Sequence, residues 1–178
     1  MNMIKLLDLL LERKKLRVFD FDDTLVKTDS YIYVTKANGK SFKLTPGEYA
    51  VYNQSPDDKF DYRDFSKVIN PVEIKTVTHR LRRIAKASRG KGIYILTARS
   101  AYAPIKKYLK DIGIPNVYVV ALASNNPEDK AKWIESKIDK EGYDDIYFID
   151  DSLKNVRAVN AVLKDKEGVR YHLHHLKH

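Results

Sequence analysis

Three aspartates, Asp20, Asp22 and Asp23, follow a short apolar run at residues 16–19. The run is rich in β-branched and aromatic residues, which predicts a buried strand. Carboxylates are costly to bury unpaired, so we expect them at the strand's exposed end, facing a cation or a reacting group. In an extended chain Asp20 and Asp22 point to one side and Asp23 to the other. Such a pair is typical of a Mg2+ site beside a phosphate; the alternative is an acidic turn in which Asp23 and Thr24 cap backbone groups.

Further polar side chains follow two later apolar segments, at residues 92–96 and 146–149. A lysine lies between these segments, in the first turn of an expected helix. The polar residues concerned are Thr97, Arg99, Lys130, Asp150 and Asp151. They supply the hydroxyl, the cations and the carboxylates that a phosphoryl-transfer site uses.

In this order the residues resemble the motifs of the haloacid dehalogenase-like (HAD) phosphatase superfamily, over residues 16–163. Each motif alone is a weak signal, but four in order on alternating strands and helices form a strong one. The matching residues are Asp20, Asp22 and Thr24 for the first motif, Thr97 for the second, Lys130 for the third, and Asp150 and Asp151 for the fourth.

The resemblance implies a hydrolysis that passes through an aspartyl-phosphate. Asp20 would attack phosphorus, and Asp22 would protonate the leaving oxygen and then deprotonate the attacking water. Thr97 would hydrogen-bond a phosphoryl oxygen, and Lys130 would offset the charge on the phosphate and on Asp20. The expected function is therefore that of an enzyme, a Mg2+-dependent phosphomonoester hydrolase.

The resemblance also implies which residues hold the magnesium ion. The ion would contact the carboxylate of Asp20, the backbone carbonyl of Asp22 and an oxygen of Asp150. Asp151 would contact it at longer range or through water, and Asn155, one helical turn further on, would do similar work.

Substrate binding is expected from Thr24 and Arg99, although Arg99 could equally pair with a carboxylate. The most similar branch of the superfamily is the phosphatase half of polynucleotide kinase-phosphatases, because of a short cap, residues 69–71 (Ile-Asn-Pro) and residues 149–151 (Ile-Asp-Asp). This similarity implies nucleotide or polynucleotide terminal phosphates as substrates. The chain has no glycine-rich phosphate loop with Lys-Ser/Thr, so a kinase half is absent and small phosphates stay open as substrates.

Apolar runs alternate with helical patterns along the chain, which predicts an α/β fold: a three-layer, Rossmann-like parallel sheet with helices on both faces. In such a sheet ligands bind beyond the carboxyl ends of the strands, where all the motifs lie. The expected strands are residues 16–21, 92–96, 117–120 and 146–149, with an edge strand at 169–173. The expected helices are residues 3–14, 71–88, 101–111, 127–140 and a last one from Ser152 to Leu163.

An insert at residues 28–66 is expected to form a small cap over the site. Asn38-Gly39 lies between two alternating segments, 31–35 and 41–44, and predicts a hairpin. Thr45-Pro46-Gly47-Glu48 predicts a capped helix to about Tyr52, and residues 53–70 have the composition of a loop. The insert's tyrosines either stack on a substrate ring or pack the cap; they are Tyr31, Tyr33, Tyr49, Tyr52 and Tyr62.

Composition limits the class of protein. The 178 residues fit one domain, the absence of cysteine excludes disulfides, and a net charge of +9 favours polyanionic partners. The predicted helix at 71–88 has the densest basic face, so an alternative function is a nucleic-acid-binding module on a HAD scaffold.

The two ends of the chain carry weaker signals. Residues 1–15 predict an amphipathic helix with neither the length of a membrane span nor the pattern of a secretory signal, and we expect a cytoplasmic protein without membrane contact. The histidines at residues 172–178 alternate with leucines, which favours the end of an edge strand over a metal site.

Overall fold

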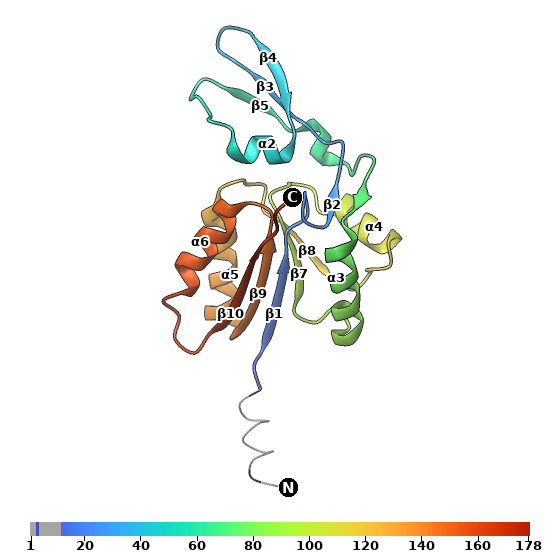
Figure 1. Ribbon diagram of the computed structural model, residues 1–178, viewed down its shortest axis with the longest axis vertical. Coiled ribbons are helices and arrows are strands. Elements are labelled where there is room, and N and C mark those ends of the chain that lie inside the picture. The colour runs from blue at the N-terminus through green and yellow to red at the C-terminus, as the bar shows by residue number, and fades with distance from the viewer. Residues whose placement is uncertain (1–2, 4–11) are drawn as a thin grey trace.

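The computed structural model describes residue 3 and residues 12–178, and it is an α/β fold with a five-stranded parallel sheet (Figure 1). The strand order is β10-β9-β1-β7-β8. The strands are β1 (Lys15–Phe19), β7 (Ile93–Thr97), β8 (Tyr118–Ala121), β9 (Asp145–Asp150) and β10 (Arg170–His175). The helices around the sheet are α3 (Lys75–Ser88), α4 (Ala103–Asp111), α5 (Pro127–Glu141) and α6 (Leu153–Leu163). The predicted Rossmann-like layering is confirmed, because α3 and α4 cover one face and α5 and α6 the other.

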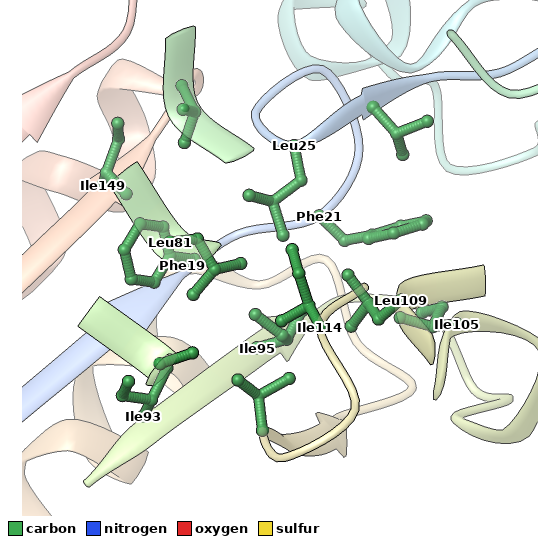
Figure 2. Close-up of a cluster of buried hydrophobic side chains, with 14 residues drawn as sticks. Phe19, Phe21, Leu25, Leu81, Ile93, Ile95, Ile105, Leu109, Ile114 and Ile149 are labelled. Atoms are coloured by element: carbon green, nitrogen blue, oxygen red, sulfur yellow. The ribbon is translucent and has the colours of Figure 1, made fainter. Parts of the chain in front are cut away.

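Strand β1 is buried on both faces, as expected for the centre of a parallel sheet. Phe19 packs with Ile95 of β7 and Leu81 of α3 (Figure 2). On the opposite face, Leu16 and Val18 pack against residues of α5 and α6.

The register of the sheet brings the motif residues to one edge. Phe19, at the end of β1, pairs with Ile149 of β9 and Ile95 of β7. Because all three strands are parallel, the residues that follow them reach the same edge of the sheet. The carboxyl end of β1 therefore lies between the ends of the two strands that carry the other motifs.

A smaller three-stranded antiparallel sheet lies beyond this edge (Figure 1). Its strands are β3 (Ile32–Thr35), β4 (Ser41–Leu44) and β5 (Lys59–Asp61), in the order β4-β3-β5, accompanied by α2 (Pro46–Val51) and the 3-10 helix η1 (Arg63–Ser66). The expected hairpin and the helix α2 are both present, and Thr45 and Glu48 form the expected capping box. The expected loop over 53–70 is present only in part, because β5 and η1 interrupt it. β5 has three residues, too few for an alternating pattern to be recognised.

The main difference from the expected elements concerns the basic helix. Residues 71–88 do not form one helix: β6 (Val72–Glu73) pairs with β2 (Val26–Lys27), and α3 begins at Lys75. Ile74 donates its backbone N–H to the carbonyl of Leu25 at 2.9 Å, which holds the segment extended up to the helix. The proline at position 71 was therefore misread as a helix start.

The other helix starts differ less. α4 begins at Ala103, not at residue 101. Ser152 occupies the N-cap position of α6, but its side chain caps no backbone group. Its backbone N–H instead donates to Asp150 Oδ1 at 2.8 Å. This bond connects the start of α6 to Asp150 and Asp151, which we call the acidic motif.

Of the predictions for the two ends of the chain, the structure tests chiefly the one for the C-terminal end. Strand β10 pairs in parallel with β9 at the edge of the sheet, as expected. The predicted N-terminal helix lies for the most part outside the described residues. Within the part of the chain that the structure describes, no helix has both the length and the apolar character to cross a bilayer.

Candidate active site

A cavity of about 520 Å³ lies between the carboxyl edge of the main sheet and the small sheet, which we call the cap (residues 28–66). Its floor includes Asp20, Asp22 and Lys130, together with the acidic motif at 150–151. Segments that are far apart in sequence therefore meet at one concave surface, which is the usual form of a small-molecule site.

The carboxylate of Asp20 is held on both oxygens. Lys130 Nζ donates to Asp20 Oδ1 at 2.7 Å, and Thr24 Oγ1 donates to Asp20 Oδ2 at 2.9 Å. The Thr24 hydroxyl also accepts the backbone N–H of Asp151 at 3.1 Å. Thr24 is fully buried and does not line the cavity, so in this structure it orients Asp20 and the acidic motif.

Lys130 lies in the first turn of α5 and bridges two carboxylates. Its Nζ donates to Asp150 Oδ2 at 2.8 Å as well as to Asp20. The two partners raise the pKa of Lys130 although its burial acts in the opposite direction. Lys130 therefore stays charged, and it offsets part of the negative charge on the floor of the cavity.

The acidic motif has more negative charge than its neighbours neutralise. Oxygens of Asp20, Asp150 and Asp151 lie within 4.8 Å of one another. Burial, followed by repulsion from Asp20, raises the pKa of Asp150 and that of Asp151. Crowded, poorly solvated carboxylates of this kind match the oxygen ligands that Mg2+ and Ca2+ prefer. Three of the four predicted metal ligands thus come together through their side chains, and Asn155 Nδ2 donates to Asp150 Oδ2 at 2.9 Å.

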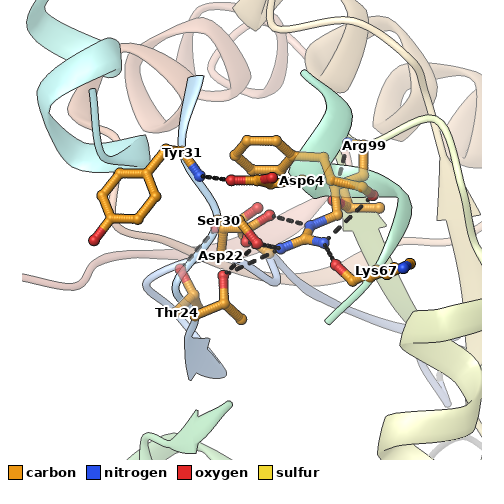
Figure 3. Close-up of polar contacts among 11 residues, drawn as sticks. Asp22, Thr24, Ser30, Tyr31, Asp64, Lys67 and Arg99 are labelled. Atoms are coloured by element: carbon orange, nitrogen blue, oxygen red, sulfur yellow. Dashed lines mark hydrogen bonds and ion pairs between the residues drawn. The ribbon is translucent and has the colours of Figure 1, made fainter. Parts of the chain in front are cut away.

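Asp22 lines the same cavity but contacts a different cation. Arg99 Nε donates to Asp22 Oδ2 at 2.9 Å, and Arg99 Nη2 donates to Asp22 Oδ1 at 2.7 Å (Figure 3). The Arg99 side chain is only 1% exposed. The structure thus shows Arg99 in the second of its two expected roles, paired with a carboxylate.

Arg99 also contacts both segments that join the cap to the main sheet. On the return segment, Arg99 Nη1 donates to the carbonyl of Lys67 at 2.6 Å and to that of Phe65 at 3.4 Å. On the outgoing segment, its Nη2 lies 3.3 Å from Thr28 Oγ1 and 3.4 Å from Ser30 Oγ (Figure 3). One buried guanidinium therefore connects Asp22 to the position of the cap.

Thr97 ends β7 and is fully buried. Its hydroxyl accepts the backbone N–H of Arg99 at 3.1 Å, and it does not line the cavity. In this structure Thr97 shapes the turn that carries Arg99, and its predicted contact with a phosphoryl oxygen stays a prediction.

The opposite wall of the cavity belongs to the cap and is largely aromatic. It includes Tyr49, Tyr52, Tyr62 and Phe65. The Tyr49 and Tyr62 hydroxyls are 2.7 Å apart, and Asn125 Nδ2, on the loop after β8, donates to the Tyr49 hydroxyl. Burial and the hydrogen bond to Tyr49 raise the pKa of Tyr62, so the Tyr62 side chain stays uncharged.

The histidine-rich tail hydrogen-bonds to the backbone of the acidic motif, a contact that the sequence did not indicate. The Leu176 N–H donates to the carbonyl of Asp150 at 2.9 Å, and His175 Nε2 donates to the carbonyl of Asp151 at the same distance. Only the pairing of β10 with β9 brings these residues to the acidic motif, so no local pattern could reveal the contact.

The basic face of α3 lies apart from the cavity, since no residue of this fully described helix lines it. Arg80 donates to the Tyr147 hydroxyl at 2.7 Å, and Arg82 pairs with Glu73 at 2.6 Å. Two cations of the predicted nucleic-acid surface are thus engaged within the protein, and nucleic-acid binding there stays a prediction.

The fold and site define an α/β protein with a capped, carboxylate-lined cavity at the carboxyl edge of a parallel sheet. Comparisons of this chain with family models, curated proteins and solved structures found no match.

Proposed function

We propose that the protein is a Mg2+-dependent phosphomonoester hydrolase of the HAD type, acting through an aspartyl-phosphate. The observation that supports this most is the arrangement of Asp20, which is oriented by Thr24 and Lys130 and lies beside Asp150 and Asp151 on the floor of a cavity. A nucleophilic carboxylate needs a fixed position and neighbouring positive charge to approach an anionic phosphate.

In the first step an oxygen of Asp20 attacks phosphorus. A bond forms between them as the bond to the leaving oxygen breaks, and the leaving oxygen takes a proton from Asp22. Lys130, which contacts Asp20 Oδ1, offsets the negative charge that gathers on the transferring group.

In the second step Asp22 accepts a proton from water, and the resulting hydroxide attacks the phosphorus of the aspartyl-phosphate. Inorganic phosphate leaves and the Asp20 carboxylate is restored, so one water is consumed for each ester bond broken. Both oxygens of Asp22 accept bonds from Arg99, which fixes the orientation of the carboxyl group at the cavity that it lines.

The donor set fits a divalent cation. Asp20, Asp150 and Asp151 would hold it, and its charge would lower the repulsion between the phosphate and these carboxylates. Asn155 and the Ser152 N–H hold Asp150 in place for this purpose.

The test of the function is the release of inorganic phosphate from small phosphomonoesters, with Mg2+ and with a chelator. We expect release that requires the metal ion. Absence of release from every ester, or equal release in the chelator, would contradict the proposal.

A second prediction concerns metal binding and pH. The pKa values of Asp150 and Asp151 are raised, so these carboxyl groups bind more protons in the folded than in the unfolded state. Without metal, the free energy of unfolding therefore falls as the pH rises towards their pKa values in the folded state. Mg2+ requires the deprotonated groups, so its stabilising effect grows with pH. We expect Mg2+ at roughly 100 times its Kd to raise the Tm by about 5–10 °C at about pH 8, and by much less at about pH 5.5.

The same measurement on variants assigns the effect to the site. Asp151→Asn should remove most of the Mg2+-induced shift, and in metal-free buffer at high pH it should be at least as stable as the unchanged protein. The exposed Asp111 lies on α4, away from the cavity, and Asp111→Asn should keep the full shift. An equal shift in both variants would place the ion elsewhere.

A further inference from the structure

The last residues of the described chain reach both loops that carry the site's aspartates. β10 runs parallel to β9 up to the pair of His175 and Asp150. Residues 175–178, which we call the C-terminal segment, continue beyond β9 toward the loop that follows β1 (Figure 1). β1 lies next to β9 in the strand order, so this segment connects the ends of three neighbouring strands.

Two histidine side chains of the C-terminal segment contact backbone carbonyls of these loops. His175 Nε2 lies 2.9 Å from the carbonyl oxygen of Asp151, and His178 Nε2 lies 2.5 Å from that of Asp23. A carbonyl oxygen can only accept a hydrogen bond, so each ring carries a proton on Nε2 and donates it. Each histidine therefore holds the backbone of one loop by a directed bond.

The C-terminal segment is itself anchored to the body of the protein. Leu176 follows His175 and packs against the buried cluster that contains Phe19 and Ile149. Its backbone N–H donates to the carbonyl of Asp150 at 2.9 Å. An apolar contact with the core and a backbone hydrogen bond thus fix the chain from which both histidine rings extend.

The two carbonyls belong to residues next to the proposed chemistry. The backbone of Asp151 is held on both sides, because its N–H donates to Thr24 Oγ1 at 3.1 Å and its carbonyl accepts from His175. Asp23 directly follows Asp22 and has a φ of 59°, a conformation that residues other than glycine adopt rarely. Contacts with the surrounding structure are needed to maintain such a conformation, and the bond from the C-terminal segment is one of them.

On these grounds we propose that His175 and His178 are positioning residues of the active site. They act through the backbone carbonyls of Asp151 and Asp23, and so fix the carboxylates that hold the metal ion and transfer the proton. The proposal rests on the proposed function, which assigns metal binding to Asp151 and proton transfer to Asp22. Neither histidine is among the described residues that line the cavity, so neither is a catalytic residue.

Calorimetric titration with Mg2+ at about pH 8 tests His175 without turnover. His175→Phe keeps a ring and removes the donor, and it should raise the Kd for Mg2+ by about 10-fold, because loss of a group that orients a metal ligand weakens metal binding by about 10–100-fold. His175→Gln keeps an N–H donor and should restore most of the affinity. An unchanged Kd in His175→Phe, or the same increase in both variants, would overturn the role of His175.

His172 provides the matched control on the same strand. Its ring stacks on that of Tyr147 at a centroid distance of 5.6 Å, and its register partner is three residues before Asp150. His172→Phe should therefore leave the Kd for Mg2+ and the turnover unchanged. If His172→Phe raised the Kd as much as His175→Phe, the effect would come from the stability of β10 and the proposal would fail.

Steady-state kinetics with a small phosphomonoester test His178. His178→Phe should lower kcat by about 10-fold at an unchanged KM, because a displaced proton donor slows the chemical step without weakening substrate binding. His178→Gln can still donate to the carbonyl and should keep most of the kcat. An unchanged kcat in His178→Phe, or a change in KM alone, would overturn the role of His178.

The two sets of measurements separate this proposal from the one on which it rests. Absence of phosphate release by the unchanged protein would overturn the phosphatase and the role of His178 in its reaction. Weaker Mg2+ binding in His175→Phe alone would still support the positioning of Asp151. Phosphate release by the unchanged protein, with a normal Kd in His175→Phe and a normal kcat in His178→Phe, would leave the phosphatase standing and overturn the role of the C-terminal segment.

Discussion

Asp20→Asn is expected to lower phosphate release by at least about 1,000-fold while the protein stays folded. The amide keeps the size of the side chain and can still accept a bond from Lys130 or Thr24, but it is a much poorer nucleophile. The folded state should be no less stable in metal-free buffer, because the change removes one of three mutually repelling carboxylates. Steady-state kinetics and thermal unfolding of the same preparation measure both effects.

The matched control is the neighbouring aspartate. Asp23 has a φ of 59° and does not line the cavity. Asparagine tolerates this left-handed conformation about as well as aspartate does, so Asp23→Asn should keep the fold and most of the activity. If Asp20→Asn kept more than about a tenth of the activity, the covalent mechanism would be wrong.

The central strand and its acidic end could be read from the sequence because local signals there agree with the tertiary structure. The apolar run at Leu16–Phe19 is buried on both faces, and a buried parallel strand requires such a run. The ends of α5 are also marked locally, by Asn126 as N-cap and Gly142 as C-cap. Here propensity, caps and packing all favour one structure.

The predicted start of α3 was wrong because the helix signal is local, whereas the strand pairing that keeps residues 72–73 extended is long-range. A proline and a following apolar pattern favour a helix from residue 71, but Val72 and Glu73 pair with β2, about 45 residues earlier in the chain. β2 and β6 precede and follow the cap in the sequence and form a two-stranded sheet of their own, so they pair only when the chain returns from the cap. Its position depends on tertiary contacts that no short window of sequence contains.

In the site, too, some contacts could be predicted from the sequence and others depend on the tertiary structure. The positions of Asp20, Lys130 and Asp150 in the sequence predicted that they meet. Asp20 and Asp150 lie at the carboxyl ends of two strands, and Lys130 lies in the first turn of a helix between the later two apolar segments. The structure brings the three into contact. The partners of Arg99 could not be deduced, since two of them are backbone carbonyls in the cap's return segment. The sequence shows the donor but not which acceptors the fold brings to it.

Replacing Arg99 with methionine is the second change expected to have a large effect. The substitution leaves Asp22 without its only ion-pair partner among the described residues and removes the contacts to both cap segments. Breaking a buried pair from one side lowers the free energy of unfolding by about 3–5 kcal/mol. We also expect phosphate release to fall by at least about 100-fold, because Asp22 loses its orientation. Chemical denaturation and steady-state kinetics measure the two effects.

Arg82→Met is the matched control, since Arg82 also pairs with a carboxylate and a backbone carbonyl but lies outside the cavity and is 31% exposed. It should cost about 1 kcal/mol or less and keep the activity. The double change Asp22→Asn with Arg99→Met should recover part of the lost stability, because no unpaired charge is left behind, yet recover no activity.

The Arg99 variant also tests whether the cap and Asp22 move together. Arg99 Nη2 donates to Asp22 Oδ1, and Nη1 of the same guanidinium donates to the carbonyl of Lys67. If the two are coupled, Arg99→Met should speed proteolysis within residues 63–70 and lower activity together, whereas Arg82→Met should change neither. Loss of activity with unchanged proteolysis would restrict Arg99 to orienting Asp22. Faster proteolysis with full activity would mean that Asp22 does its work without Arg99.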